Sequence, residues 1–373
     1  MPEILSAAAC NLDANILAAC LPLMEESRLE AIEWSFDALF KVQQIPSWFL
    51  ELLTAYSNEQ RLIGHGVFFS LFSGKWRQEQ ADWLKQLKKV REEFRFDHVT
   101  EHFGFMTGRD FHHGAPLNIP YTKTTLDIGR DRLKRIYEAC ECPVGLENLA
   151  FSYSLDEVKR HGAFLEQLLE PVNGFIILDL HNLYCQIHNF NIPFEEIITH
   201  YPLDKVREIH ISGGSWENAP NSPLKKIRRD THDDAVPAEV FHLLENTIAR
   251  CSHLKYVVLE QLGNALTTEE SRTIFYNDFG KMENIVKKKN TPGISSYQSF
   301  LPSSPVITGK IIEDEILYHQ QLELSAILES ATSCEEAIQS LTRSSLAHTA
   351  WQIENWEPYM IDTAIQIAQK WKK

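Results

Sequence analysis

Apolar and polar positions divide the chain into two kinds of segment that alternate. Short runs of β-branched and other apolar residues predict buried strands, and the longer stretches between them carry apolar residues at helical spacing. Such alternation requires a parallel sheet, and eight strand–helix units in about 290 residues match the size of a (β/α)₈ TIM barrel. The predicted strands are 4–9, 31–34, 62–69, 98–103, 144–149, 175–180, 206–211 and 256–260.

Helices are predicted after the strands, with clear signals at two of their starts. Ser154 with Glu157 three residues later forms a capping box, and Thr267 or Thr268 is suited to cap the last helix of the barrel. The most regular predicted helices are 76–94, 123–139, 155–169, 239–250 and 267–287.

Two connections, 104–121 and 212–237, are unusually long, and both leave the carboxyl end of a predicted strand. They are rich in Gly, Pro, Asn and His. Loops longer than about 12–15 residues in a compact domain are usually lids or binding loops. We therefore expect both segments to border a functional site.

The chain is predicted to have three parts. Residues 1–287 form the TIM-barrel catalytic domain that binds metal, 288–305 contain Pro, Ser and Gly without periodicity and form a linker, and 306–373 form a helical C-terminal extension. The extension is expected to hold two to four helices. They either pack back onto the barrel or form a surface for a partner.

Charge and composition exclude several classes of protein. The formal net charge of −15 argues against general affinity for nucleic acid or for an anionic membrane, and no apolar run is long enough to cross a bilayer. The basic run 225–229 is interpreted as a solvated loop, with an anion contact as the alternative. Seven cysteines without a C-x-x-C pair favour a reducing, cytoplasmic location, and no P-loop, dinucleotide fingerprint or serine-hydrolase elbow is present.

Residues able to bind metal recur at the predicted strand ends. A single histidine in a strand usually belongs to the core. Glu147, Asp179 and Glu260, however, each close an apolar run, where an ionised carboxylate is costly unless it is paired or bound to a cation. Carboxylates at equivalent places, interleaved with histidines, favour a metal site. The donors at strand ends are Glu33, His65, Glu101, His102, Glu147, Asn148, Asp179, His181, His210 and Glu260.

The number of donors favours more than one metal ion. A catalytic ion such as zinc takes about three protein ligands, so two or three ions bridged by carboxylates fit better than one. Imidazole and carboxylate without thiolate suit iron, manganese or zinc. The candidate ligands are His65, His102, Glu147, Asn148, Asp179, His181, His188, His210, Asp230, His232 and Glu260.

Seven short motifs, in order along the chain, resemble those of the DUF692 family, the multinuclear non-haem iron-dependent oxidative enzymes (MNIO). The resemblance covers about residues 1–285, and it implies a TIM barrel with two or three iron ions, Fe2+ or Fe3+, for which zinc or manganese are alternatives. It also implies O2-dependent modification of residues, often cysteine, in a ribosomally made precursor peptide, and a partner protein that presents this peptide. The motifs are Gly64-His-Gly-Val, Thr100-Glu-His-Phe, Gly145-Leu-Glu-Asn, Leu178-Asp-Leu-His-Asn-Leu-Tyr, Arg207-Glu-Ile-His-Ile, Asp230-Thr-His-Asp and Leu259-Glu.

By position, the resemblance assigns the metal to the candidate ligands above, with Asn148 and His181 the least firmly matched. Two departures leave the substrate and product open. Relatives often carry a second histidine shortly after the position of His210, where this chain has Ser212-Gly213-Gly214, and they commonly have Asn in place of His181.

Two other functions remain open from the sequence. Hydrolases and isomerases of the xylose isomerase and endonuclease IV kind also collect His, Asp and Glu at the strand ends of a TIM barrel. The chain could instead be a non-catalytic, metal-containing scaffold or partner protein whose C-terminal helices recruit another molecule.

Overall fold

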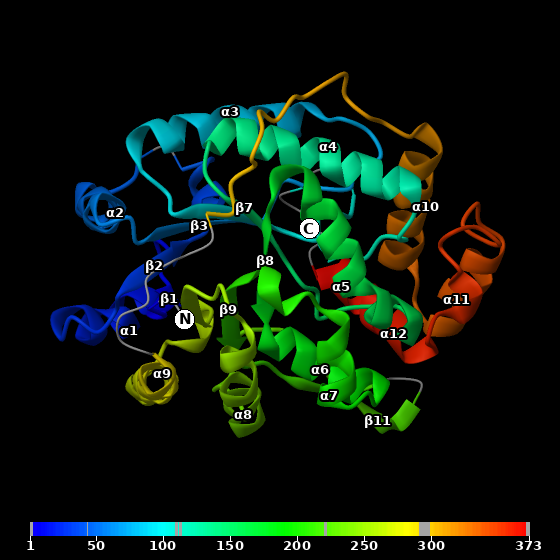
Figure 1. Cartoon of the computed structure of the whole chain (residues 1–373). Coiled ribbons are helices and arrows are strands. Elements are labelled where there is room, and N and C mark those ends of the chain that lie inside the picture. Colours follow the sequence, from blue (N-terminus) through cyan, green and yellow to red (C-terminus); the bar gives the residue numbers. More distant parts are fainter. Residues whose placement is uncertain are drawn as a thin grey trace.

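The computed structural model describes residues 3–42, 44–108, 111, 114–219, 222–290 and 299–370, without the side chains of 222–224. Its centre is a closed parallel barrel in the order β1-β12-β9-β8-β7-β4-β3-β2, which confirms the predicted (β/α)₈ TIM barrel (Figure 1). The barrel strands are β1 Leu5–Ala9, β2 Ala31–Trp34, β3 Leu62–Gly66, β4 His98–His102, β7 Val144–Glu147, β8 Phe175–Asp179, β9 Val206–Ser212 and β12 Tyr256–Glu260.

Strand β3 is shorter than predicted because a neighbouring carboxylate takes over its backbone hydrogen bonds. The N–H groups of Val67 and Phe68 both donate to Asp37 Oδ2 at 2.8 Å, so the chain leaves the barrel after Gly66. The apolar run continues beyond this point as a buried loop, and pattern alone does not separate the two.

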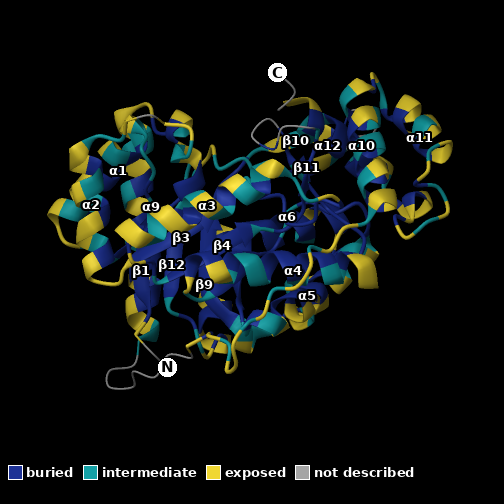
Figure 2. Cartoon of the chain, turned by 90° about the horizontal axis from the view of Figure 1, so that it is seen from above, coloured by how far each residue is buried: buried dark blue, intermediate teal, exposed yellow. Residues whose placement is uncertain are grey.

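Helices surround the barrel and bury their inner faces against it, as the dark-blue centre of Figure 2 shows. The helices are α1 Ala14–Glu25, α2 Ser47–Asn58, α3 Gln78–Glu93, α4 Lys123–Cys140, α5 Leu155–Leu169, α6 Leu180–Phe190, α7 Phe194–Ile197, α8 Ala238–Thr247 and α9 Glu269–Lys289. None of the helices within the described ranges is long and apolar enough to span a membrane.

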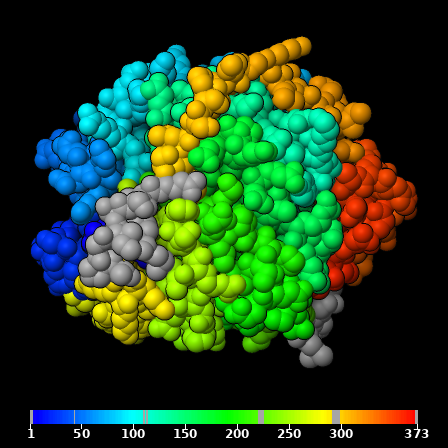
Figure 3. Space-filling view, viewed as in Figure 1, coloured from blue at the N-terminus to red at the C-terminus, as the bar shows by residue number. Residues whose placement is uncertain are grey.

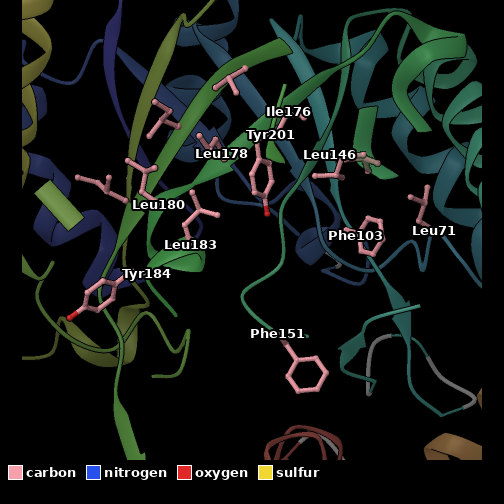
Figure 4. Packing of buried hydrophobic residues seen from close by; sticks show 14 of the residues in the cluster. Leu71, Phe103, Leu146, Phe151, Ile176, Leu178, Leu180, Leu183, Tyr184 and Tyr201 are labelled. Atoms are coloured by element: carbon pink, nitrogen blue, oxygen red, sulfur yellow. The ribbon is translucent and has the colours of Figure 1, made fainter. Parts of the chain in front are cut away.

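The strand alternation decides which side chains enter the barrel. Leu146, Ile176 and Leu178 belong to the large apolar core between strands and helices (Figure 4). Because successive residues of a strand point to opposite faces, Glu147 and Asp179 point into the barrel. The same alternation that builds the core therefore delivers carboxylates to the interior.

The helix starts agree with the sequence only in part. Ser154 Oγ accepts from the N–H of Glu157 at 3.3 Å and caps α5, as predicted. The predicted return bond of the capping box, from the N–H of Ser154 to the Glu157 side chain, is wrong. The Glu157 carboxylate accepts from the N–H of Tyr153 at 2.7 Å instead. Thr268, not Thr267, caps α9.

Both long connections contain antiparallel hairpins that the sequence did not reveal. The first holds β5 (Phe105–Met106) and β6 (Pro116–Leu117), and the second holds β10 (Trp216–Ala219) and β11 (Ser222–Arg228). The interpretation of 225–229 as a solvated loop is wrong, since Ile227 and Arg228 are buried in β11.

The C-terminal extension contains α10 (Glu315–Ser330), α11 (Cys334–Thr342) and α12 (Pro358–Lys370), within the predicted number. It packs against loops that leave the carboxyl ends of β4 and β7, and Figure 3 shows it in orange and red along one flank. The Trp356 ring stacks on Tyr153 with centroids 3.7 Å apart, and Trp351 meets Phe105 edge-on at 6.0 Å. The division into domain, linker and extension stays a prediction.

Candidate metal centre

The first group of donors joins the ends of β3, β4 and β7. His65 Nε2 lies 2.9 Å from His102 Nε2, and Glu147 Oε2 lies 3.6 Å and 3.4 Å from these two atoms. Burial lowers the pKa of His65 well below its usual range and that of His102 to about 4. Both imidazoles are therefore neutral at physiological pH, as metal ligands must be.

A threonine that the sequence analysis did not select sets the orientation of His65. Thr100 Oγ1 lies 2.8 Å from His65 Nδ1 and donates to the carbonyl oxygen of Gly64 at 3.3 Å. Because its own proton goes to Gly64, Thr100 accepts the Nδ1 proton of His65. The lone pair of His65 Nε2 then points at His102 and Glu147.

The second group lies deeper and is held by four strands. Ligand atoms of Glu147, Asp179, His210 and Glu260 all lie within 4.8 Å of one another. His210 Nδ1 is 3.1 Å from Glu260 Oε2 and 3.9 Å from Glu147 Oε1. Asp179 Oδ2 is buried without a hydrogen-bond partner among the described residues, as expected of a carboxylate whose partner is a bound cation.

A third set of donors comes from the loop after β11 and from α6. Asp230 Oδ1 lies 3.0 Å from His232 Nε2 and 3.0 Å from His181 Nδ1. His232 Nδ1 is 3.7 Å from Glu260 Oε2. Glu260 therefore touches both the second and the third set, and Glu147 belongs to both the first and the second. Two carboxylates in such positions suit a cluster of bridged ions better than separate sites.

The carboxyl groups are poorly compensated without cations. Burial raises the pKa of Glu147 well above its usual range, and burial together with Asp230 and Glu260 raises the pKa of Asp179 to about 7. Burial alone would raise the pKa of Glu260, but His210 lowers it below the usual range. The donor set thus fits di- or trivalent cations, which would compensate the charge that burial penalises.

Metal binding is expected to release protons and to strengthen as the pH rises. Below its pKa of about 7 the Asp179 carboxyl carries a proton in the metal-free protein, and this proton competes with the metal. Affinity should change by about tenfold per pH unit for each proton released. Titration calorimetry with Zn2+ at about pH 6 and about pH 8, in buffers of different protonation enthalpy, measures both effects. An affinity that stays constant over this range would contradict the expectation.

Two predicted ligands are not brought into these groups. Asn148 uses its side chain on the backbone of Asp179, accepting from the N–H at 2.6 Å and donating to the carbonyl oxygen at 3.1 Å. The His188 ring packs against Tyr184 and Trp216, with centroid distances of 4.4 Å and 5.0 Å. Their place in the ligand set stays a prediction.

Two strand-end donors that are not among the candidate ligands, Glu33 and Glu101, lie in different places. Glu33 Oε2 lies 3.1 Å from His210 Nε2, on the side of that ring turned away from the second group. Glu101 alternates with His102 and therefore lies outside the barrel, beside Trp83 and Gly66.

Two further residues that contact the ligands were missed. Asn182 Nδ2 donates to Glu147 Oε1 at 3.2 Å, and Glu208 Oε1 lies 3.1 Å from His210 Nε2. The alternation of side chains along a strand could have revealed Glu208, because residues two apart, such as Glu208 and His210, lie on the same face.

The sequence was compared with protein families and with curated proteins. The family model described as RiPP precursor modification enzyme MbnB/TglH/ChrH matches residues 27–271. A UPF0276 protein of Caulobacter vibrioides is 25% identical over 203 residues, which cover 54% of this chain and 69% of that protein. A UPF0276 protein of Acaryochloris marina is 27% identical over 213 residues, 55% and 71% of the two chains.

Among solved structures, a xylose isomerase domain protein from Planctomyces limnophilus superposes with a TM-score of 0.51 at 13% identity. The superposition covers 77% of this chain and 99% of that one, and at this identity it shows the shared TIM-barrel fold alone. The family match spans most of the barrel, including the strands that carry the donors. The chain therefore belongs to the MbnB/TglH/ChrH family of RiPP precursor modification enzymes, the DUF692 family that its motifs resemble.

Proposed function

We propose that this protein is an O2-dependent, multinuclear non-haem iron oxidoreductase that modifies residues, cysteine in particular, of a ribosomally made precursor peptide. One observation carries the proposal: Glu147 and Glu260 each belong to two neighbouring groups of donors. Two carboxylates shared between groups suit a multinuclear centre better than a single ion. Membership of a family that modifies precursor peptides supplies the substrate class.

The donor chemistry supports iron. The groups contain imidazole and carboxylate without thiolate, a set that suits iron and that zinc or manganese can also use. In the proposed enzyme, His65, His102 and Glu147 would hold one ion, and Glu147, Asp179, His210 and Glu260 would hold a second. Asp230 and His232, with His181 beside them, would supply further ligands.

Bound iron supplies the redox chemistry and a Lewis acid that can orient a substrate thiolate. The protein's own contribution is positioning and the exclusion of water. Thr100 and Asn182 orient His65 and Glu147, and the hairpins β5–β6 and β10–β11 follow strands whose carboxyl ends carry ligands. We assign the peptide-binding face to this end of the barrel, where TIM barrels bind substrate.

The proposal includes a precursor peptide as partner and, in addition, a protein that presents it. Nucleic acid and membranes are not proposed partners, in keeping with the net charge of −15. All seven cysteines are free, which suits the reducing cytoplasm that we propose as the location.

Iron dependence is tested directly by metal analysis and oxygen uptake. Protein purified without added metal should contain iron. After anaerobic loading with Fe2+ and exposure to O2, the protein should consume O2 when a cysteine-containing precursor peptide is present. The same peptide with serine in place of cysteine is the control and should support none. A preparation that contains only zinc, and that hydrolyses or isomerises substrates without O2, would favour the xylose isomerase-like alternative.

A further inference from the structure

A line of buried carboxyl and imidazole groups runs beneath the metal centre along the barrel interior. Glu208 Oε1 lies 3.1 Å from His210 Nε2, and Glu208 Oε2 lies 2.5 Å from His98 Nε2. His98 Nδ1 in turn lies 2.9 Å from Asp97 Oδ2. The side chains of His98, Glu208 and His210 are 0% exposed, so bulk water does not reach them.

The far end of this line is anchored at the amino-terminal end of the barrel. Asp97 directly precedes β4, and its carboxylate accepts from Arg207 Nη2 at 2.8 Å and pairs with Lys255, which directly precedes β12. The side chains of Arg207 and Lys255 therefore hold the Asp97 carboxylate in place. These contacts connect the amino-terminal end of the barrel with His210 near the other end.

The two nitrogens of His210 face opposite ways. Nδ1 faces Glu260 and Glu147 in the second group, and Nε2 faces Glu208. A neutral imidazole binds a metal ion through the nitrogen that carries no proton, and the hydrogen bond of the other nitrogen decides which one that is. A carboxylate at Nε2 accepts a proton there and leaves the lone pair on Nδ1.

We propose that Glu208, clamped by His98, is a positioning residue of the metal centre: it keeps the proton of His210 on Nε2 and so directs Nδ1 at the metal. Glu33 Oε2 also lies 3.1 Å from this nitrogen, but Glu208 is the partner with a second imidazole fixing its other oxygen. The inference rests on the metal centre of the proposed function and is independent of the oxidation.

Co2+ titration of the metal-free protein tests this role, with calorimetry for affinity and visible absorption for the ligand environment. Glu208→Gln removes the negative charge that holds the proton of His210 on Nε2. We expect Co2+ affinity at the second group to fall by about 10–100-fold, the usual effect of losing such a partner, with an altered cobalt spectrum. Glu208→Asp keeps the acceptor and should recover part of the affinity, and His98→Asn should weaken binding less than Glu208→Gln.

The matched control is Asp131→Asn, which breaks a buried ion pair with Arg132 and Arg135 on α4. It should lower the thermal stability and leave the Co2+ affinity and spectrum unchanged. Wild-type binding and spectrum in Glu208→Gln would overturn the inference. The inference would also be overturned if Glu208→Gln bound one ion fewer and kept its affinity for the remaining ions. Glu208 would then itself be a metal ligand, together with Glu33 and His210. A wild type that binds no Co2+ would instead refute the metal centre.

Discussion

Replacing Glu147 by glutamine is expected to remove most of the bound metal while leaving the metal-free protein at least as stable as the wild type. Glu147 belongs to both the first and the second group of donors, so its loss affects more than one ion. In the metal-free protein its pKa is raised by burial, so ionising it at neutral pH costs stability. Glutamine removes that cost together with the metal ligand.

Elemental analysis and thermal unfolding of the metal-free protein measure the two effects separately. Glu260→Gln is the informative comparison, because it should also lose metal but should destabilise the metal-free protein. Its carboxylate is paired with His210 at 3.1 Å, and removing one partner of a buried pair costs about 3–5 kcal/mol. If Glu147→Gln instead kept its metal and unfolded more easily, Glu147 would be a structural ion-pair residue.

Replacing Trp356 by alanine should destabilise the whole protein by about 3–5 kcal/mol, the usual cost of truncating a buried tryptophan. Trp356 is 6% exposed, its ring stacks on Tyr153, and its Nε1 donates to the carbonyl oxygen of Trp351 at 2.9 Å. Tyr153 lies in the loop that follows β7, so the substitution should also lower the stability of the barrel. Chemical denaturation, followed by fluorescence and by circular dichroism, measures the change.

Trp48→Ala is the control, because Trp48 is 50% exposed and its removal should change stability by less than about 1 kcal/mol. Coincident transitions by both probes would show that the extension and the barrel unfold together. Two separate transitions, with the barrel unaffected by Trp356→Ala, would show that the helices form an independent unit. That outcome would favour the recruiting role considered for the C-terminal helices.

The barrel was predictable because its strands are buried on both faces and therefore appear as short apolar runs between amphipathic helices. The donors His65, His102, Glu147 and Asp179 stood out because charged or polar residues interrupt these runs at the same place in each unit. The hairpins were not predictable, since β5 and β6 have two residues each and lie in segments rich in turn-forming residues.

The partners of the donors could not be found from spacing. Asn148 follows Glu147 and is a predicted ligand, and spacing did not reveal that its amide also bonds the backbone of Asp179 on the neighbouring strand. Glu208 was not selected from the sequence, and its proposed role depends on His98, which is 110 positions away in the chain. Such contacts are set by barrel closure and register.

The order of strands and the chemical type of the donors were thus already present in the sequence, because both follow from local pattern. Which donors lie within ligand distance of one another, which nitrogen of His210 faces them, and where the C-terminal helices dock were decided by the tertiary structure alone. These properties depend on distances between strands far apart in the chain. Closure of the barrel brings Glu147 and Glu260 into one group of donors, and their separation along the sequence does not predict that proximity.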